Sequence, residues 1–446
     1  MRLKLSFAPK KHNGAIGLIL RSLLAGFLAG AAVSVFNFFA EKVSDAGYGV
    51  YSKIADEPLS LLWALPLAAG LGLISLLILK LDPEVAGSGI PNVEKAFSGL
   101  KRLGRAKVFC GTVMGGLITF FGGLSLGAEG PSVAIGAAVG YAVADRCNSN
   151  DKASSAIAAG AAGAGFAAAF HAPVAGMLFA MEELKKGFDM SQALAALSAA
   201  AASVAGFTLT GLIWGGEWFK YDFSAIATPP VENAWWSVFA VALAAGCAAA
   251  LFIGSLESVQ ASALLKRIPV GVRLTSAFIL AALAAAYIDG SFGSGQQVLN
   301  GLIRGEFTLK ATLMLFAAKT VLTLTGFYSK ATGGLLIPSL ALGALIGGAV
   351  GEVMHVSGAI SGDTTIFVVA GMAAFMGAAF GTPLTAAVLA LELTCADARA
   401  SLYILAAVIV ASAAASLLKR KPLYEFMIAD DFFPGSFSDK LFLENA

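Results

Sequence analysis

One charged residue inside a long apolar run constrains this chain most. Across residues 108–144, Glu129 is the only residue with a formal charge, and the uncharged stretches on both sides are of membrane length. A charge placed there is costly, so it is expected to face a partner or a water-filled cavity and to serve function. The run therefore predicts a membrane-embedded site around Glu129.

Apolar runs of this kind recur along all 446 residues. The chain is 58% hydrophobic and 13% charged, whereas soluble proteins average about a quarter charged. A β-barrel would alternate over short segments and would not produce such continuous runs. We therefore predict an all-α, polytopic membrane protein with roughly 16–18 membrane-embedded helices, several of them partial or broken at the midplane.

The residues after Glu129 indicate where a helix begins. Gly130 and Pro131 open the next apolar segment, and proline is favoured in the first turn of a helix, where its missing N–H is no loss. Glu129 is thus expected at the amino end of an embedded helix, where free N–H groups and the positive dipole end can bind an anion. The acid and an anion would compete for one position. The alternative is a structural acid paired with a base, but no basic residue lies nearby in sequence.

The sequence also contains an internal repeat. Residues 168–173 (AAFHAP) match 378–383 (AAFGTP) at an offset of 210, and residues 131–137 match 338–344 at an offset of 207. Both breaks contain a proline that should interrupt a helix. Related halves with interrupted segments at corresponding positions indicate a transporter with a site at the membrane midplane. The alternative is that Ala-rich membrane helices resemble one another by composition.

This repeat gives the predicted organisation of the chain. It consists of a short basic cytoplasmic lead, a first membrane half, an inter-half loop, a second membrane half, and a C-terminal helix with a tail, at residues 1–13, 14–216, 217–232, 233–420 and 421–446. Basic residues gather near residues 101–107, 185–186, 266–273 and 419–421, whereas the expected loops 41–57 and 217–232 are acidic. By the positive-inside rule, the basic loops and both termini are expected in the cytoplasm.

Four helix starts are marked by glycine or proline, and they stand at residues 87–91 (GSGIP), 127–131 (GAEGP), 334–338 (GLLIP) and 421–424 (KPLY). In this order they resemble the motifs GSGIP, G(K/R)EGP and GxFxP and the C-terminal tyrosine of the CLC family of chloride channels and chloride/proton antiporters. The similarity covers most of the chain. It implies a homodimer in the cell inner membrane, with one anion path per subunit built from two inverted-topology halves. No regulatory nucleotide-binding domain of the CBS type is expected.

The resemblance implies a set of chloride-binding residues. The hydroxyls of Ser88 and Tyr424 would donate to a central anion, and backbone N–H groups around Leu335, Leu336 and Ala128 to Gly130 would serve the central and outer sites. Two structural alternatives stay open: Ser88 as a helix N-cap and Tyr424 as an aromatic residue at the membrane interface.

The resemblance also implies roles for the acids. Glu129 matches the gating glutamate, which occupies an anion position when ionised and swings away when protonated. Glu183 matches the internal proton-transfer glutamate of the antiporters, where channels typically have an apolar residue, and the adjacent Glu182 is expected to help water or protons enter. These features favour a chloride/proton antiporter over a passive gated chloride channel. The alternative for Glu182 and Glu183 is a solvated salt-bridge cluster with Lys185 and Lys186.

Two departures from the family pattern affect rate and gating more than transport. Ala128 replaces the usual basic residue, and Leu336 replaces the usual phenylalanine. Ser88 argues for chloride over nitrate and against the fluoride branch. Chloride and protons are the expected partners, together with the lipid bilayer, and no cofactor, metal or nucleic acid is expected.

An intramembrane hydrolase that uses Ser125 and His171 is the alternative from another functional class. However, the flanks of Ser125 match no nucleophile turn, and His171 is expected to pack or cap a helix.

Overall fold

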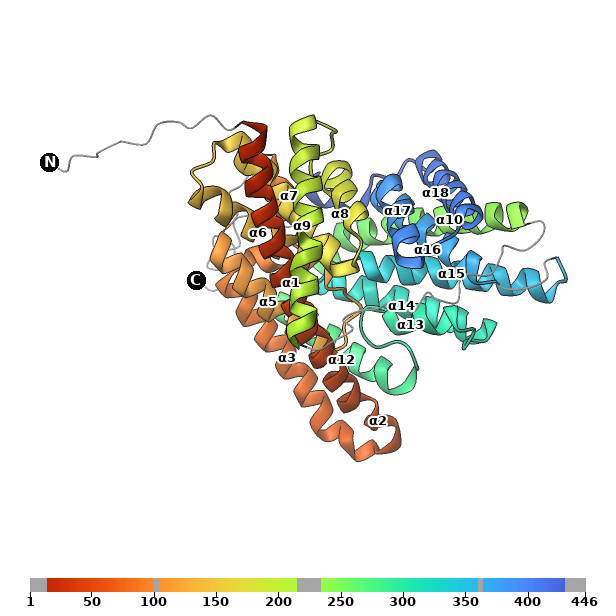
Figure 1. Ribbon diagram of the computed structural model, residues 1–446. Coiled ribbons are helices and arrows are strands. Elements are labelled where there is room, and N and C mark those ends of the chain that lie inside the picture. The colour runs from red at the N-terminus through yellow and green to blue at the C-terminus, as the bar shows by residue number, and fades with distance from the viewer. Residues whose placement is uncertain (1–13, 99–103, 215–233, 360–363, 430–446) are drawn as a thin grey trace.

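The computed structural model describes residues 14–98, 104–214, 234–359 and 364–429, and helices dominate it (Figure 1). Within these ranges, nine helices are long and apolar enough to cross a membrane. This confirms the prediction of an all-α, multi-pass membrane protein. The predicted lead 1–13, the inter-half loop 217–232 and residues 430–446 of the predicted tail lie outside the described residues.

The described part of the first half contains nine α-helices and three short helical turns. In chain order they are α1 (Ala15–Tyr51), α2 (Lys53–Asp56), η1 (Pro58–Ser60), α3 (Leu61–Leu81), η2 (Pro83–Val85), α4 (Ile90–Phe97), α5 (Arg105–Phe121), α6 (Glu129–Arg146), α7 (Asp151–Phe170), α8 (Pro173–Phe179), the π-helical turn η3 (Ala180–Leu184) and α9 (Met190–Trp214).

The second half repeats this order approximately. Its helices are α10 (Ala234–Ala261), α11 (Ala263–Lys266), α12 (Val270–Tyr287), α13 (Gln296–Ile303), α14 (Leu309–Ser329), α15 (Leu336–Val356), α16 (Thr365–Phe380), α17 (Pro383–Thr394), α18 (Ala398–Leu417) and α19 (Leu423–Ala429).

Both predicted helix breaks are confirmed. α7 ends at Phe170, and α16 ends at Phe380. Each is followed by a residue in the left-handed conformation, His171 with φ 53° and Gly381 with φ 71°. This conformation ends helices by satisfying their last carbonyls. A proline then opens the next helix, because its ring fixes φ near the helical value.

The chain folds as two related halves of inverted topology, as predicted. α6 packs on α7 as α15 packs on α16, and α1 packs on α9 as α10 packs on α18. The halves meet at an antiparallel bridge, in which the Gly127 N–H donates to Gly334 O at 2.8 Å and the Gly334 N–H donates to Gly127 O at 2.7 Å. These two glycines are repeat mates at the same offset of 207. The halves also exchange contacts, since α12 packs against α3 (Figure 1).

A second reciprocal contact joins α8 and α17. The Glu392 carboxylate at the end of α17 accepts from the N–H groups of Val174 and Ala175 at 2.9 and 2.7 Å. In return, the Glu182 carboxylate accepts from the N–H of Leu384 at 3.1 Å and from the N–H of Thr385 at 2.7 Å. Each glutamate therefore binds the free N–H groups at the start of the other half's helix. Glu392 therefore has a structural role at the start of α8.

The prediction that residues 41–57 form an acidic loop is wrong. α1 continues as a helix to Tyr51, and α2 follows at once. Gly47 lies in close contact with the backbone of Phe121, and Tyr51 is fully buried. Charged residues mark where the apolar part of a helix ends, whereas packing against α5 continues the helix beyond that point.

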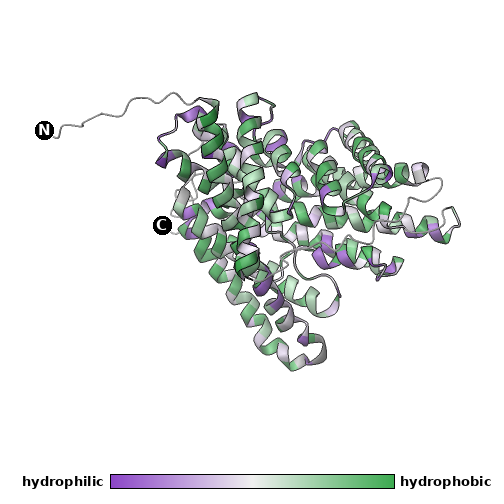
Figure 2. Cartoon of the chain, viewed as in Figure 1, coloured by the Kyte–Doolittle hydropathy of each residue, from purple (hydrophilic) through white to green (hydrophobic). Residues whose placement is uncertain are grey.

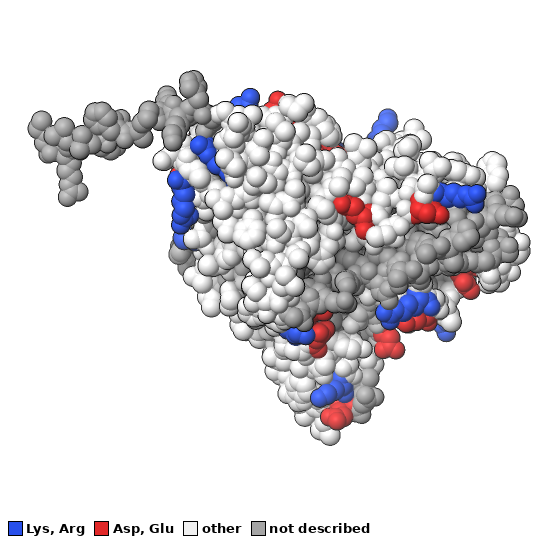
Figure 3. All heavy atoms as spheres, in the orientation of Figure 1, with Lys and Arg blue, Asp and Glu red and all other residues white. Residues whose placement is uncertain are grey.

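The outer surface is that of a membrane protein. Apolar residues dominate the helices (Figure 2), and many large apolar side chains are exposed, among them Leu20, Leu77, Leu212 and Ile409. In the view of Figure 3, a broad expanse in the left-hand part carries no charged side chain, and the charges lie at its margins and over the right-hand and lower parts of the molecule. Such a surface is suited to lipid.

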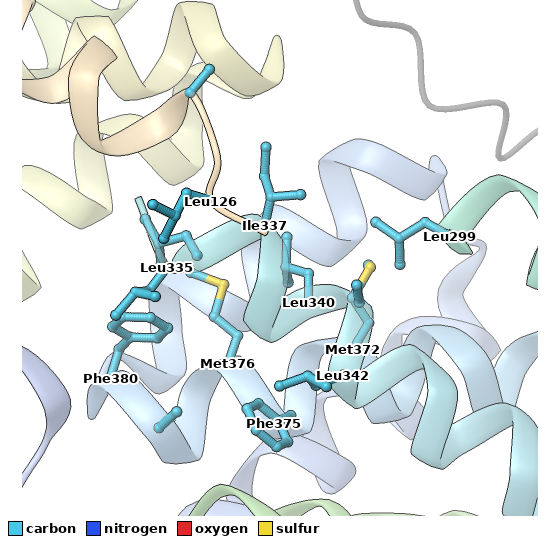
Figure 4. Packing of buried hydrophobic residues seen from close by; sticks show 14 of the residues in the cluster. Leu126, Leu299, Leu335, Ile337, Leu340, Leu342, Met372, Phe375, Met376 and Phe380 are labelled. Atoms are coloured by element: carbon cyan, nitrogen blue, oxygen red, sulfur yellow. The ribbon is translucent and has the colours of Figure 1, made fainter. Parts of the chain in front are cut away.

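The core packs densely around the midplane loops. Leu126 and Leu335 come from the two loops that form the glycine bridge, and they lie close to Met376 and Phe380 of α16 (Figure 4). All four side chains are buried. These apolar contacts hold the loop backbone in place, so the N–H groups of the loops have fixed positions.

We expect Glu392→Ala to lower the stability of the protein, because it leaves the first N–H groups of α8 without their acceptor. Loss of such a cap costs about 1–2 kcal/mol. The midpoint of thermal unfolding in detergent should fall, and Glu392→Gln, which keeps one acceptor, should lose less. Glu306→Ala, at an exposed side chain, is the control, and equal midpoints for Glu392→Ala and this control would contradict the assignment.

Candidate functional site

Glu129 joins the amino ends of two helices. It is the first residue of α6 and has no exposed surface. Its Oε1 atom accepts a hydrogen bond from the Ile337 N–H at 3.1 Å, in the first turn of α15. Its Oε2 atom is buried and has no hydrogen-bond partner among the described residues. The carboxylate thus takes a backbone donor at a helix amino end, a position suited to an anion.

Glycines make room for this carboxylate. A Cβ atom at Gly127 would lie 1.9 Å from Oε2 of Glu129, and one at Gly334 would lie 2.4 Å from Oε1. Any larger residue at either position would displace the acid. The glycine bridge between the halves therefore also forms part of the binding site.

Ser88 and Tyr424 meet beside α6 although they are far apart in sequence. Their hydroxyl oxygens are 3.3 Å apart, both side chains are buried, and either hydroxyl can donate. The Tyr424 ring packs against Phe380 with centroids 5.0 Å apart. Gly130 lies next to this pair, since a Cβ atom there would be 2.9 Å from the Ser88 Oγ.

The structural alternatives for these two residues do not fit the geometry. The N-cap of α4 is Gly89, which has φ 75° and no side-chain cap, so Ser88 lies one residue earlier. Tyr424 has no exposed surface, which is unlike an interfacial aromatic residue. Neutral hydroxyl donors and helix amino ends therefore converge on one buried region, as the four motifs predict.

The other residues expected at the anion site line the same region. Leu335 and Leu336 are buried at the start of α15, and Gly130 is buried in the first turn of α6. The N–H that reaches Glu129 is that of Ile337, the next residue along the chain from the expected pair.

Glu183 lies in the π-helical turn η3 and is only 3% exposed. Its charged neighbours include Glu94 and Lys186, which form an ion pair at 2.6 Å. Glu94 belongs to α4, the helix whose amino end lies next to Ser88. This short helix therefore connects the hydroxyl pair with the surroundings of Glu183.

The neighbouring acids Glu182 and Glu183 point to different surroundings. Glu182 binds the amino end of α17 and also accepts from the Thr385 hydroxyl at 2.7 Å. A π-helical turn changes the register of successive side chains, and such turns are frequent at functional sites. Among the described residues, Lys186 pairs with Glu94 and Lys185 donates to Ser155 Oγ. The alternative, in which Lys185 and Lys186 would form a salt-bridge cluster with Glu182 and Glu183, differs from this arrangement, because Lys186 pairs with Glu94 instead.

A cavity of about 220 Å³ lies next to Glu129, since the neighbouring Ala128 is among its lining residues. Ile337, whose N–H reaches Glu129, also lines it, while Glu41 and Asp45 contribute acidic groups to its wall. Ala128 stands where the family usually has a basic residue, so the lining of this cavity holds two acids and an alanine.

α13 was not predicted from the sequence, and the residues that open this helix line part of the cavity. Residues 293–295 (GSG) open α13 as residues 87–89 (GSG) open α4. The Gly87 N–H donates to Lys330 O at 3.3 Å, and the Gly293 N–H donates to Gly123 O at 3.0 Å. The two GSG runs are 206 residues apart, close to the offset of the other repeats, so the sequence held a signal for this pair.

A buried lysine was also missed. Lys319 of α14 is 1% exposed, and its Nζ donates to Ser291 O at 3.0 Å and to Gly293 O. It holds the loop that leads into α13. Lys319 is the only charged residue across residues 311–329, and this was the available signal, by the same reasoning that singled out Glu129.

The residues of the hydrolase alternative have other partners. Ser125 Oγ shares a hydrogen bond with Thr323 Oγ1 at 2.8 Å. His171 caps the end of α7 and packs against Phe207 with ring centroids 4.7 Å apart. This placement matches the packing or capping role expected for His171.

Comparison with known proteins identifies the family. Residues 70–416 match the family described as "Voltage gated chloride channel". The chain belongs to this family, the CLC family. Proteins named "H(+)/Cl(-) exchange transporter ClcA" from Klebsiella pneumoniae (strain 342) and Salmonella arizonae are each 30% identical to it, over 94% of this chain and 90% of theirs. These CLC relatives are transporters, not enzymes.

Solved structures show the same fold. A slow cyanobacterial Cl⁻/H⁺ antiporter superimposes with a TM-score of 0.83 at 21% identity, covering 93% of this chain and 99% of that one. A CLC-type fluoride/proton antiporter gives 0.71 at 20% identity, covering 93% and 98%. Both confirm the CLC architecture of two inverted halves.

We expect Gly130→Ala to disrupt the site. The added Cβ would lie 2.4 Å from Ser88 O and 3.0 Å from Gly334 Cα, so backbone must move. Gly70→Ala in α3 meets nothing within 4 Å and is the matched control, expected to be neutral or slightly stabilising. Calorimetric titration with chloride should show at least about ten-fold weaker binding for Gly130→Ala, equivalent to about 1.4 kcal/mol. Unchanged affinity would contradict this packing.

Proposed function

We propose that this protein is a chloride/proton antiporter. One observation carries the proposal: the fully buried Glu129 carboxylate accepts from the amino end of α15, beside the Ser88–Tyr424 hydroxyl pair. A negatively charged side chain thus occupies donors that a chloride ion would use. The names of the ClcA relatives support exchange of chloride against protons.

Chloride would be held by neutral groups. Ser88 and Tyr424 each offer a hydroxyl, and the amino ends of α6 and α15 offer N–H groups near Ala128, Gly130, Leu335 and Leu336. These donors replace part of the hydration shell without supplying a full positive charge. A bound anion is therefore held weakly enough to leave, as transport requires.

Protonation of Glu129 would control access to these donors. As a carboxylate, Glu129 competes with chloride for the N–H of Ile337. When a proton neutralises it, the acid is a much weaker acceptor and leaves the helix end, so chloride can bind. A chloride ion and a proton therefore exchange at the same position, which couples their movements in opposite directions.

Glu183 would pass protons between the cytoplasmic face and Glu129. It is buried next to the Glu94–Lys186 ion pair, at the far end of α4 from Ser88. A proton that reaches Glu183 would cross to Glu129, while chloride passes between the hydroxyls. Glu182 was expected to help protons enter. Because both of its oxygens accept hydrogen bonds from the start of α17, we propose that it chiefly positions the turn that carries Glu183.

The membrane location, the orientation and the oligomeric state can be inferred from the family and from the charge distribution. We propose the inner membrane as the location, both termini in the cytoplasm, and a homodimer with one anion path in each subunit. The basic groups near α3, α4 and α12 would then face the cytoplasm. Dimerisation is measurable by light scattering of the purified protein with its detergent contribution subtracted.

The test is paired measurement of chloride and proton flux in liposomes containing the purified protein. An outward chloride gradient should drive proton uptake into the liposomes when no proton gradient is present. The alternative is a passive gated chloride channel on the same fold, for which chloride would flow with no proton movement.

We expect Glu129→Ala to leave chloride flux running but to abolish its coupling to protons. The substitution removes the group that exchanges with chloride at α15, and it keeps the backbone donors. Flux of both ions is measured in the same liposomes. Proton uptake at the wild-type ratio would contradict the role given to Glu129.

We expect Glu183→Gln to reduce proton transport by at least about ten-fold, a common size for loss of a proton-transfer group, while chloride still flows. Glutamine keeps the size of the side chain but cannot carry the proton. Glu306→Gln, at an exposed acid, is the control. If Glu183→Gln and the control both keep wild-type coupling, Glu183 is not on the proton path.

A further inference from the structure

A second cavity lies far from the anion site, where the end of α3 meets the start of α12. Its volume is about 870 Å³. Its wall combines apolar side chains with basic ones, and its lining includes Leu73, Leu76, Ile279, Lys80, Lys266, Arg267 and Arg273. Among the described residues, its lining holds four basic and no acidic side chains. The transport mechanism uses none of these residues.

The apolar part of the cavity faces the surroundings of the protein. α3 and α12 are both candidate membrane spans. Leu73 is 59% exposed, and Val272, which also lines the cavity, is 55% exposed. In a membrane these side chains would contact acyl chains, so the groove is open to lipid along its length.

The basic part lies at the ends of these spans. Lys80 is in the last turn of α3, and Lys266 and Arg267 stand at the end of α11, just before α12 begins. All three side chains are exposed. α3 leads through η2 to α4, which carries Glu94, so the cavity lies on the same side of the protein as Glu183.

The floor of the cavity is fixed. The Arg273 guanidinium lies over the Tyr328 ring, 4.7 Å from its centroid, and donates to Tyr328 O at 3.4 Å. The Tyr328 hydroxyl donates in turn to Leu265 O, beside Lys266. These contacts hold α11, α12 and the end of α14 together, so the basic groups stand on a preformed surface.

We propose that this cavity binds an anionic phospholipid. The phosphate and any further negative group of its headgroup contact Lys80, Lys266 and Arg267, and an acyl chain lies along Leu73, Leu76 and Ile279. Basic pockets between membrane helices on the cytoplasmic side bind anionic headgroups in this way. The apolar wall selects a lipid over a soluble anion, because a free phosphate would leave that wall unused.

The test is native mass spectrometry of the purified full chain, titrated with phosphatidylglycerol and with phosphatidylcholine of the same acyl chains. Wild-type protein should bind phosphatidylglycerol about ten-fold more tightly, since each cation near a headgroup adds to the attraction. Lys80→Gln/Lys266→Gln/Arg267→Gln should lose most of this preference. These side chains are exposed, so the variant should fold, and an unchanged thermal unfolding midpoint checks this.

A control variant removes the same charge elsewhere. Lys53→Gln/Arg304→Gln/Lys310→Gln changes three other exposed basic residues and should keep the preference. Equal binding of the two lipids by wild type, or equal loss in both variants, would overturn the proposal. Competition by inorganic phosphate as effective as that by phosphatidylglycerol would also overturn it, since it would indicate a soluble-anion site. Binding is measured without transport, so this outcome is independent of the proposed antiport.

Discussion

The structure depends on backbone N–H groups that stand free at helix amino ends inside an apolar protein. Such groups need an acceptor, because lipid and packed side chains supply none. At the centre of this chain, the Glu129 carboxylate accepts from α15 while lying at the start of α6. Broken helices, close-packed glycines and neutral hydroxyls surround this carboxylate, and in the function we propose a chloride ion takes its place.

The same interaction, repeated by symmetry, joins the halves. Gly127 and Gly334 exchange two hydrogen bonds at the centre. Farther out, Glu182 and Glu392 each bind the amino end of the other half's helix. Contacts at helix ends therefore join the two halves, in addition to the packing of α12 on α3. In the function we propose, this frame stays rigid around the anion path while little more than the Glu129 side chain moves.

Local sequence signals predicted much of this. Proline and glycine at residues 171–173 and 381–383 gave the helix breaks, and the four motifs gave Ser88, Glu129 and Tyr424. The error over 41–57 arose because hydropathy reports contact with lipid, whereas α1 continues by packing against α5. α13 and Lys319 were missed because short helices and single buried cations are specified by distant partners.

The sequence by itself determined that the chain lies in a membrane, that it has two related halves, and where an acid meets a helix start. These follow from composition, repeat offsets and the conformational limits of proline and glycine, which act over a few residues. Only the tertiary structure decided that the N–H of Ile337 reaches Glu129, that Glu182 and Glu183 diverge, and that Lys80 meets Arg273 in one cavity. Those pairings join segments that are distant in sequence or separated by a change of helical register, so they depend on how the helices pack rather than on local preference.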